Sequence, residues 1–255
     1  MNTYVIYGIV CFFVFMAGFV DAIAGGGGLI SLPAYMIAGL PAHTAIATNK
    51  MSSSMGTTVA SWHYFRQGFM KWKLCIPAIM GAIVGSSLGA RLTLLIPENA
   101  LKIAMLIVLP VILFYVTKSK TLSGEAENRE EVINGTLIFK CVLIALAIGV
   151  YDGIYGPGTG TFLMLLFSGF CRMTMNDAAG TTKAINLTTN ITALIVFIMN
   201  GKVLLGLGIT AGICNMIGNF LGSHCFTDKG TKIVKPIMIV VIVIFFIKVL
   251  TELIG

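Results

Sequence analysis

Long apolar runs separated by short polar stretches follow one another along the whole chain. A helix needs about 20 predominantly apolar residues to cross the roughly 30 Å hydrocarbon core of a bilayer, and several runs approach or reach that length. The pattern predicts an all-α, polytopic membrane protein of about eight transmembrane helices and two short broken segments. The expected segments are 4–24, 29–40, 44–65, 74–92, 100–116, 137–155, 161–170, 177–199, 203–223 and 233–250.

Two glycine-rich stretches interrupt this pattern. Asp21 precedes the four glycines of residues 25–28, and Asp152 precedes residues 156–160, which contain three glycines and Pro157. Glycine disfavours a helix through its backbone entropy, and proline has no N–H to donate, so both stretches should break their helices. Broken backbone at membrane depth is tolerated only where it is buried in protein or lines a cavity. The two stretches therefore predict a transport site between discontinuous helices.

The second half of the sequence repeats rare polar and glycine positions of the first, at a constant offset that shifts once at a small insertion. The matched pairs are Asp21 and Asp152, Gly25 and Gly156, Lys50 and Lys183, Ser53 and Asn186, Thr57 and Asn190, Gly68 and Gly201, Gly85 and Gly218, and Gly89 and Gly222. We interpret this as a duplication, with repeats at 1–117 and 135–255 and a charged linker at 118–134. The glycines at 81, 85 and 89, and at 218 and 222, recur every fourth residue and predict close helix contacts.

The two short segments either cross the membrane or re-enter it on one side. If they cross, most lysines and arginines gather on one face, as the positive-inside rule expects. Each half then has five segments, an odd number, which makes the halves inverted repeats. This arrangement predicts a cytoplasmic loop at 66–73, a cytoplasmic linker and periplasmic termini. Re-entry stays open because helices of 10 to 12 residues span only about 15–18 Å.

Composition supports a membrane location and narrows the partners. The chain is 57% hydrophobic and 11% charged, against about 25% charged for a soluble domain, and its mean hydropathy is +0.94. The net charge of +7 comes without a basic helix or an aromatic-basic patch, so we expect the lipid bilayer and no nucleic acid as a partner. Six cysteines and three histidines lack metal-binding spacing, so no metal or cofactor is expected.

Lys50 and Lys183 each lie in an otherwise uncharged segment and begin a polar stripe at helical spacing. A lysine near the bilayer centre costs at least about 2.5 kcal/mol, so it should face a cavity or an acidic partner. In a structural interpretation, each lysine pairs with Asp21 or Asp152 and the other polar groups join helices. In a functional interpretation, the lysines and the backbone amides that follow the glycines bind an anion, and the aspartates orient the lysines.

The functional interpretation defines a set of candidate residues. The predicted substrate-binding residues are Gly25, Gly26, Gly27, Gly28, Asn49, Lys50, Ser53, Gly156, Gly158, Thr159, Thr182, Lys183, Asn186 and Asn190. Asp21 and Asp152 are predicted to form ion pairs or to couple transport to protons. We expect no catalytic residues, since the glycine run lacks the ending of a phosphate loop and no HExxH or serine-based motif accompanies it. A structural or regulatory membrane protein and an intramembrane enzyme are the alternatives.

The order and spacing of several motifs resemble the TauE/SafE family, also called the sulfite exporter or toluene sulfonate uptake permease family. The motifs are GGGGLISLPA (25–34), ATNKM (47–51), YDGIYGPGTGTF (151–162), TTKAINLTTN (181–190), NGKV (200–203) and KGTKIVKP (229–236). The resemblance covers nearly the whole chain and implies transport of small anions, among them sulfite, sulfonates and sulfoacetate, across a bacterial inner membrane. Gly158 and Thr159 stand where relatives often carry alanine. The anion, the direction, proton coupling and a homo-oligomeric state stay open.

Overall fold

The computed structural model describes residues 2–118 and 133–224. Within these ranges the chain forms nine helices and no strand, which confirms the all-α prediction. The helices are α1 (Thr3–Ala24), α2 (Gly28–Ile37), α3 (Ala42–Arg66), α4 (Trp72–Leu95), α5 (Glu98–Lys118), α6 (Gly135–Ile154), α7 (Thr159–Gly169), α8 (Met175–Met199) and α9 (Leu205–His224). The predicted segment 233–250 lies outside the described residues.

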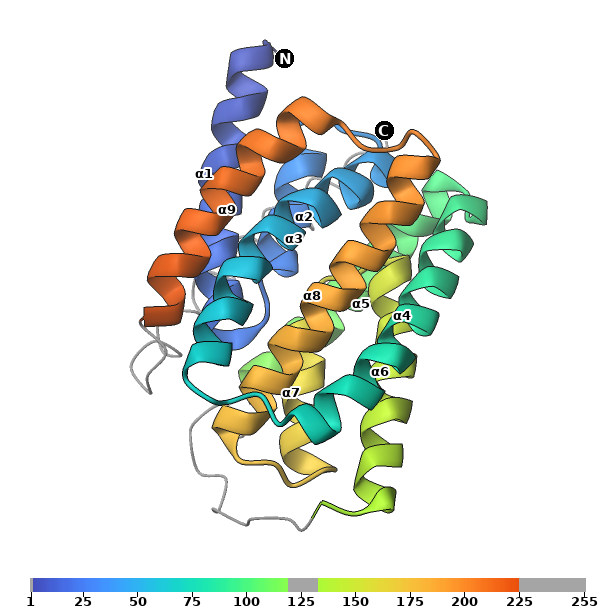
Figure 1. Cartoon of the computed structure of the whole chain (residues 1–255). Coiled ribbons are helices and arrows are strands. Elements are labelled where there is room, and N and C mark those ends of the chain that lie inside the picture. Colours follow the sequence, from blue (N-terminus) through green and yellow to red (C-terminus); the bar gives the residue numbers. More distant parts are fainter. Residues whose placement is uncertain (1, 119–132, 225–255) are drawn as a thin grey trace.

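The two halves of the chain are interleaved in one helical bundle. The most extensive contacts join α4 with α6 and α1 with α9, so the fourth helix of each half packs against the first helix of the other. In Figure 1, α1 and α3 run downwards and α4 runs upwards, whereas their counterparts α6 and α8 run upwards and α9 runs downwards. Each of these helices is therefore antiparallel to its counterpart in the other half.

Glycines let the interleaved helices approach closely. A Cβ atom on Gly85 of α4 would lie 2.2 Å from the carbonyl oxygen of Leu146 in α6. At the matching position in α9, a Cβ atom on Gly218 would lie 2.1 Å from the carbonyl oxygen of Phe15 in α1. Both distances are far below van der Waals contact, so the backbones of these helix pairs touch. This confirms the close contacts that the glycine spacing predicted.

The helix breaks occur where the glycine-rich stretches predicted them. The first lies between α1 and α2, and the second between α6 and α7. Gly25 ends α1 with a φ of 70°, a left-handed conformation that favours glycine, and its N–H donates to the carbonyl oxygen of Asp21. A Cβ atom on Gly25 would lie 2.5 Å from the carbonyl carbon of Gly160. The two breaks are therefore in direct contact, although Gly25 and Gly160 lie 135 positions apart in the sequence.

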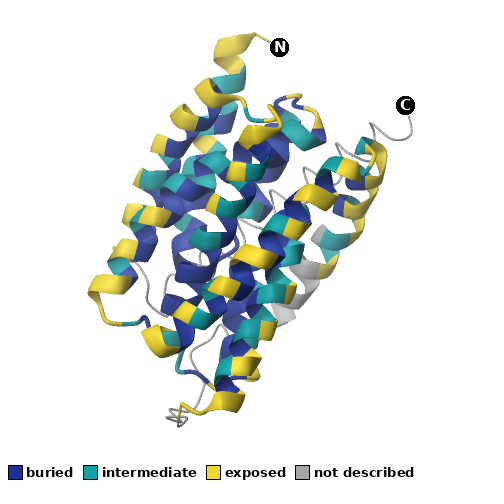
Figure 2. Cartoon of the chain, turned by 45° about the vertical axis from the view of Figure 1, so that its right-hand side comes forward, coloured by how far each residue is buried: buried dark blue, intermediate teal, exposed yellow. Residues whose placement is uncertain are grey.

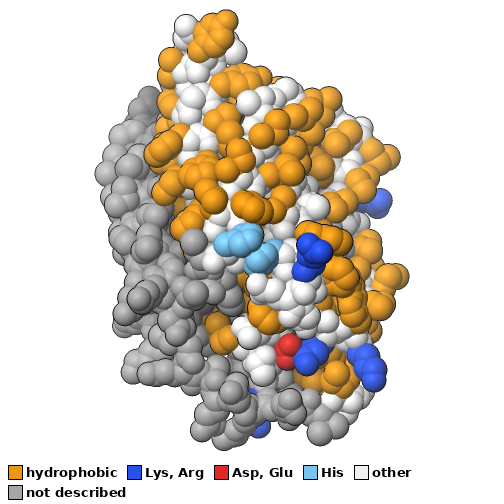
Figure 3. All heavy atoms as spheres, turned by 60° about the vertical axis from the view of Figure 1, so that its left-hand side comes forward, with side chains coloured by type: hydrophobic (Ala, Val, Ile, Leu, Met, Phe, Trp, Pro, Cys, Tyr) orange, Lys and Arg blue, Asp and Glu red, His pale blue; other side chains and the backbone are white. Residues whose placement is uncertain are grey.

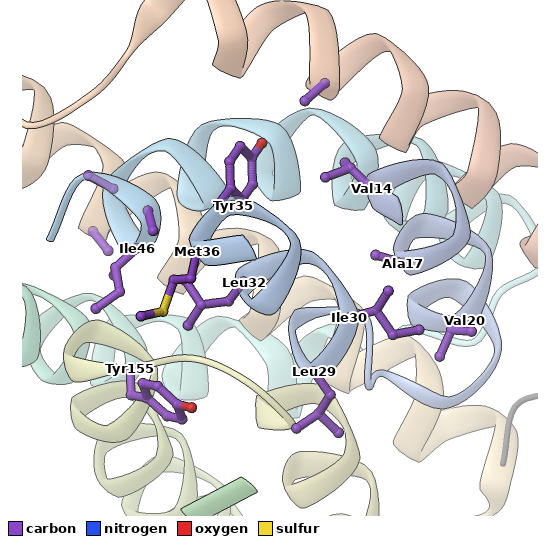
Figure 4. Packing of buried hydrophobic residues seen from close by; sticks show 14 of the residues in the cluster. Val14, Ala17, Val20, Leu29, Ile30, Leu32, Tyr35, Met36, Ile46 and Tyr155 are labelled. Atoms are coloured by element: carbon purple, nitrogen blue, oxygen red, sulfur yellow. The ribbon is translucent and has the colours of Figure 1, made fainter. Parts of the chain in front are cut away.

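The short helix α2 is enclosed by protein. Its residues from Leu29 to Met36 are all buried, and it packs against α1 and α3. Figure 4 shows side chains of α2 directed towards Val14, Ala17 and Val20 of α1 and towards Tyr155. The Tyr35 hydroxyl donates a hydrogen bond of 2.9 Å to the Ser52 Oγ of α3. The backbone next to the first break thus has the protein surroundings that an interrupted helix requires in a membrane.

The outer surface of the bundle is apolar. Buried residues line the inner sides of the helices in Figure 2, while large hydrophobic side chains such as Met80, Leu95 and Phe139 are exposed. Hydrophobic side chains also predominate on the face in Figure 3, where charged ones are few. In the described part of the chain, α1, α4, α6, α8 and α9 are long and apolar enough to cross a membrane. The polar stripe of α3 keeps that helix out of this group.

Candidate functional site

Two buried ion pairs connect the halves of the chain. Lys50 Nζ in α3 lies 2.6 Å from Asp152 Oδ2 in α6, and Lys183 Nζ in α8 lies 2.8 Å from Asp21 Oδ2 in α1. Each lysine therefore pairs with the aspartate of the other half of the chain. The Lys50 and Lys183 residues are only 2% and 3% exposed, so both charges are removed from solvent. The structural interpretation of the lysines predicted such pairing.

The ion pairs are anchored to the helix breaks. The Thr159 hydroxyl, at the start of α7, donates to Asp152 Oδ1 at 2.6 Å. Lys183 Nζ also donates to the backbone oxygen of Asp21, in the last turn of α1. A Cβ atom on Gly156 would lie 3.0 Å from Lys50 Nζ, so glycine lets the lysine reach its partner beside the second break. Moving either break would therefore disturb a buried charge.

A small polar cavity lies between the two breaks and helices α3, α8 and α9. The volume open to the centres of water molecules is about 20 Å³, enough for about one or two waters. A larger ligand needs the walls to move apart. The cavity is lined by Ala17, Asp21, Gly25, Gly27, Gly28, Asn49, Lys50, Ser53, Thr57, Asp152, Gly156, Thr159, Gly160, Asn186, Asn190 and Asn215.

The cavity contains most of the residues that the sequence marked as candidates. Gly26, Gly158, Thr182 and Lys183 are the candidates that do not line it. Lys183 is instead held at the end of α1 by Asp21. The hydroxyl of Thr182 is buried and has no hydrogen-bond partner within the described residues. The two lysines are thus equivalent in their pairing but differ in their access to the cavity.

Four lining residues were absent from the predicted set, namely Ala17, Thr57, Gly160 and Asn215. Thr57 belonged to the polar stripe, and Gly160 to the second glycine-rich stretch. Asn215 was missed because its counterpart, in the register that aligns Lys50 with Lys183, is the apolar Ala82. The signal that could have identified Asn215 is a polar amide within an otherwise apolar segment. The residues that the two halves contribute to the cavity therefore do not match position by position.

Three of the asparagines that line the cavity have side-chain oxygens that are already hydrogen-bonded. The side-chain oxygen of each accepts a hydrogen bond from its own helix, Asn49 from Ser53 (3.5 Å), Asn186 from Asn190 (3.4 Å) and Asn215 from Asn219 (2.6 Å). Within the described residues, the Nδ2 atoms of Asn49, Asn186 and Asn215 donate to no acceptor, although all three side chains line the cavity. These three amides are therefore available to a partner that offers acceptor atoms.

Comparison with known proteins identifies the family. The family described as "Sulfite exporter TauE/SafE" matches residues 10–249. The chain belongs to the TauE/SafE family. The probable membrane transporter protein ORF9 of Sinorhizobium sp. is 35% identical, over 93% of this chain and 90% of its own length. The probable membrane transporter protein YfcA of Escherichia coli K12 is 32% identical, over 96% of this chain and 90% of its own.

A third relative of this TauE/SafE protein, a probable membrane transporter protein of Haemophilus influenzae, is 28% identical over 89% of this chain and 87% of its own length. No solved structure matches the chain. The family and its relatives, together with five helices able to cross a membrane, show a multi-pass membrane transporter protein. The family resemblance drawn from the sequence motifs is thereby confirmed.

Hydrogen-bond donors, as well as charged groups, contribute to the electrostatic potential in this TauE/SafE cavity. Lys50 and Lys183 are each compensated by an aspartate, so the two ion pairs are neutral together. Helices α2 and α7 begin at the cavity, where the N–H groups of Leu29 and Thr159 already donate to the carbonyl oxygens of Gly26 and Gly156. The positive ends of both helix dipoles therefore add to the asparagine donors. This combination suits an anion with several acceptor oxygens.

Proposed function

We propose that the protein is a secondary transporter that moves a small, sulfur-containing anion such as sulfite, a sulfonate or sulfoacetate through the cavity between the helix breaks. The observation that carries this proposal is that Asn49, Asn186 and Asn215 line the cavity and that their side-chain N–H groups have no acceptor within the described residues. Sulfur oxyanions offer several charged acceptor oxygens, and hydrogen bonds to charged acceptors are roughly twice as strong as neutral ones. The description of the family and the names of its relatives as probable membrane transporters support transport over catalysis.

In this proposal the asparagines and the N-termini of α2 and α7 hold the anion, and Lys50 contributes its charge from the cavity wall. The Lys183 pair positions the end of α1. Protonation of Asp152 would leave Lys50 as an uncompensated cation, so proton uptake and anion binding would favour each other. The proposed coupling therefore carries a proton and an anion in the same direction. A cavity of this volume is too small for the anion, so transport requires its walls to move apart.

We assign to the transporter eight transmembrane helices and two short broken segments in a bacterial inner membrane, with the halves as inverted repeats. The antiparallel course of counterpart helices in Figure 1 and their reciprocal packing support the inversion. Inverted halves aim the N-termini of α2 and α7 at one site from opposite sides of the bilayer. Rocking of one half against the other would then open the cavity to each side in turn.

A flux assay with purified protein in liposomes tests the proposal. Uptake of sulfite, thiosulfate, an alkyl sulfonate and a small carboxylate is measured with and without an inward proton gradient. We expect at least one sulfur anion to enter faster than into protein-free liposomes, and Asn49→Asp to abolish this because it replaces a donor by a negative acceptor. Asn200→Asp, at the exposed end of α8, should keep the flux. Folded protein without flux for any of these anions would favour a structural or regulatory role.

A further inference from the structure

An apolar groove lies between α3, α4 and α8, away from the polar cavity. Its volume open to the centres of water molecules is about 400 Å³, and its lining includes Trp62 and Phe65 of α3, Trp72 of α4, and Ala184 and Leu187 of α8. Both α4 and α8 are long and apolar enough to cross a membrane. A groove between two such helices opens towards lipid, so its natural occupant is an apolar chain.

Aromatic rings mark one end of the groove. The rings of Trp62 and Phe65 have centroids 5.5 Å apart, and those of Phe65 and Trp72 are 5.8 Å apart. Trp62 and Trp72 are 59% and 47% exposed. Exposed tryptophans are typical of the membrane–water interface, where one part of the ring contacts lipid tails and another the headgroups. The groove therefore ends at the level where lipid headgroups begin.

Cationic side chains lie at the same end. The Arg66 guanidinium carbon lies 5.7 Å from the centroid of the Trp62 ring. Lys71 is partly neutralised by Asp177, whose Oδ2 is 3.6 Å from its Nζ. Lys73 is exposed one position after Trp72, and neither it nor Arg66 forms an ion pair within the described residues. Within the described residues, two cations without an acidic partner thus lie next to tryptophans of the groove, Arg66 at Trp62 and Lys73 directly after Trp72 in the sequence.

We propose that this groove binds an anionic phospholipid, with one acyl chain between α3, α4 and α8 and the phosphate at Arg66 and Lys73. The apolar lining alone would accept the tail of any phospholipid, but the uncompensated cations favour a headgroup with a net negative charge. A hydrogen bond connects the groove to the helix that carries Lys183, because the hydroxyl of Ser61, which lines the groove, donates to the carbonyl oxygen of Lys183 at 3.0 Å. The site requires no assumption about the transported anion.

Native mass spectrometry of the detergent-purified protein tests this site. The probes are phosphatidylglycerol and phosphatidylcholine with the same acyl chains, and soluble glycerol phosphate. We expect phosphatidylglycerol to bind at least about tenfold more tightly than phosphatidylcholine, and Arg66→Gln/Lys73→Gln to lose this preference, since each cation near an anionic headgroup contributes about tenfold or less. Arg91→Gln/Lys202→Gln removes the same charges at the other end of the bundle and should keep the preference.

The tail is tested separately with Thr58→Phe, which places a ring in the groove from an exposed position of α3. This variant should weaken binding of both phospholipids while remaining folded. Equal binding of the two lipids by the unmodified protein, or an unchanged preference in Arg66→Gln/Lys73→Gln, would overturn the proposal. Full displacement of phosphatidylglycerol by glycerol phosphate would assign the contact to the headgroup alone. A dimer that Thr58→Phe dissociates would assign the groove to a second copy of the chain.

Discussion

Lys50 and Asp152 lie 102 positions apart and form a buried contact of 2.6 Å that joins the two halves of the transporter. The same exchange of partners joins Lys183 to Asp21. Each pair fixes one helix break to a helix of the other half, so the two breaks cannot move independently without separating buried charges. Any conformational change that separates the two breaks would therefore have to break at least one of these ion pairs.

Replacing Lys50 with methionine should destabilise the protein by about 3–5 kcal/mol, because it leaves the carboxylate of Asp152 buried without its cation. A fall in the apparent unfolding temperature in detergent measures the effect. Lys50→Met/Asp152→Asn should recover most of the loss, since it removes both charges together. If the double variant were no more stable than the single one, the two residues would not be acting as a pair.

The contact between the two breaks predicts that Gly160→Ala stops transport. A Cβ atom at this position would lie 2.6 Å from the Cα of Gly25, a distance that forces the breaks apart. Gly8→Ala in α1 is the matched control, because nothing lies within 4 Å of its Cβ position. Flux in liposomes is the measurement, with membrane insertion checked for both variants. Normal flux through Gly160→Ala would show that the breaks need not touch.

Inverted repeats predict that two equivalent loops face opposite sides of the membrane. The loop between α3 and α4 and the loop between α8 and α9 lie at opposite ends of the bundle in Figure 1. In a cysteine-free background, Lys202→Cys should react with an impermeant maleimide in whole cells, and Gln67→Cys only after lysis. Both positions are exposed, so accessibility within the protein does not limit labelling. Labelling of both from the same side would contradict the inversion.

The helix breaks and the buried lysines could be predicted from the sequence because glycine runs and charged side chains are energetically unfavourable in a membrane-spanning helix. Glycine runs and isolated lysines such as Lys50 stand out against an apolar background, and their repetition marked them further. The exchange of partners between halves could not be predicted, since either aspartate satisfies the charge of either lysine. Only the packing of α4 on α6 and of α1 on α9 decides between them.

Other features were hidden because they depend on which side of a helix faces the cavity. Lys183 and Lys50 occupy equivalent positions in the repeat, yet only Lys50 lines the cavity. Asn215 has no polar counterpart, so the repeat gave it no weight. The segment 44–65 was predicted from the sequence, yet α3 is not among the helices that are apolar enough to cross a membrane, because the polar stripe that lines the cavity lowers its hydropathy. The polar residues that line the cavity thus lower the hydropathy by which a membrane-spanning helix is recognised.

The central claim, that the asparagine N–H groups bind the anion, is tested most directly by calorimetric binding to Asn186→Asp and Asn215→Asp. An aspartate at either position keeps an acceptor for the internal hydrogen bond from Asn190 or Asn219 and replaces the free donor by a negatively charged oxygen. With the sulfur anion that the flux assay selects, at constant ionic strength, affinity should fall roughly tenfold to a hundredfold in each variant, as expected for loss of a hydrogen bond to a charged group. Asn200→Asp should bind as the unmodified protein does. Unchanged affinity in both cavity variants would contradict the account.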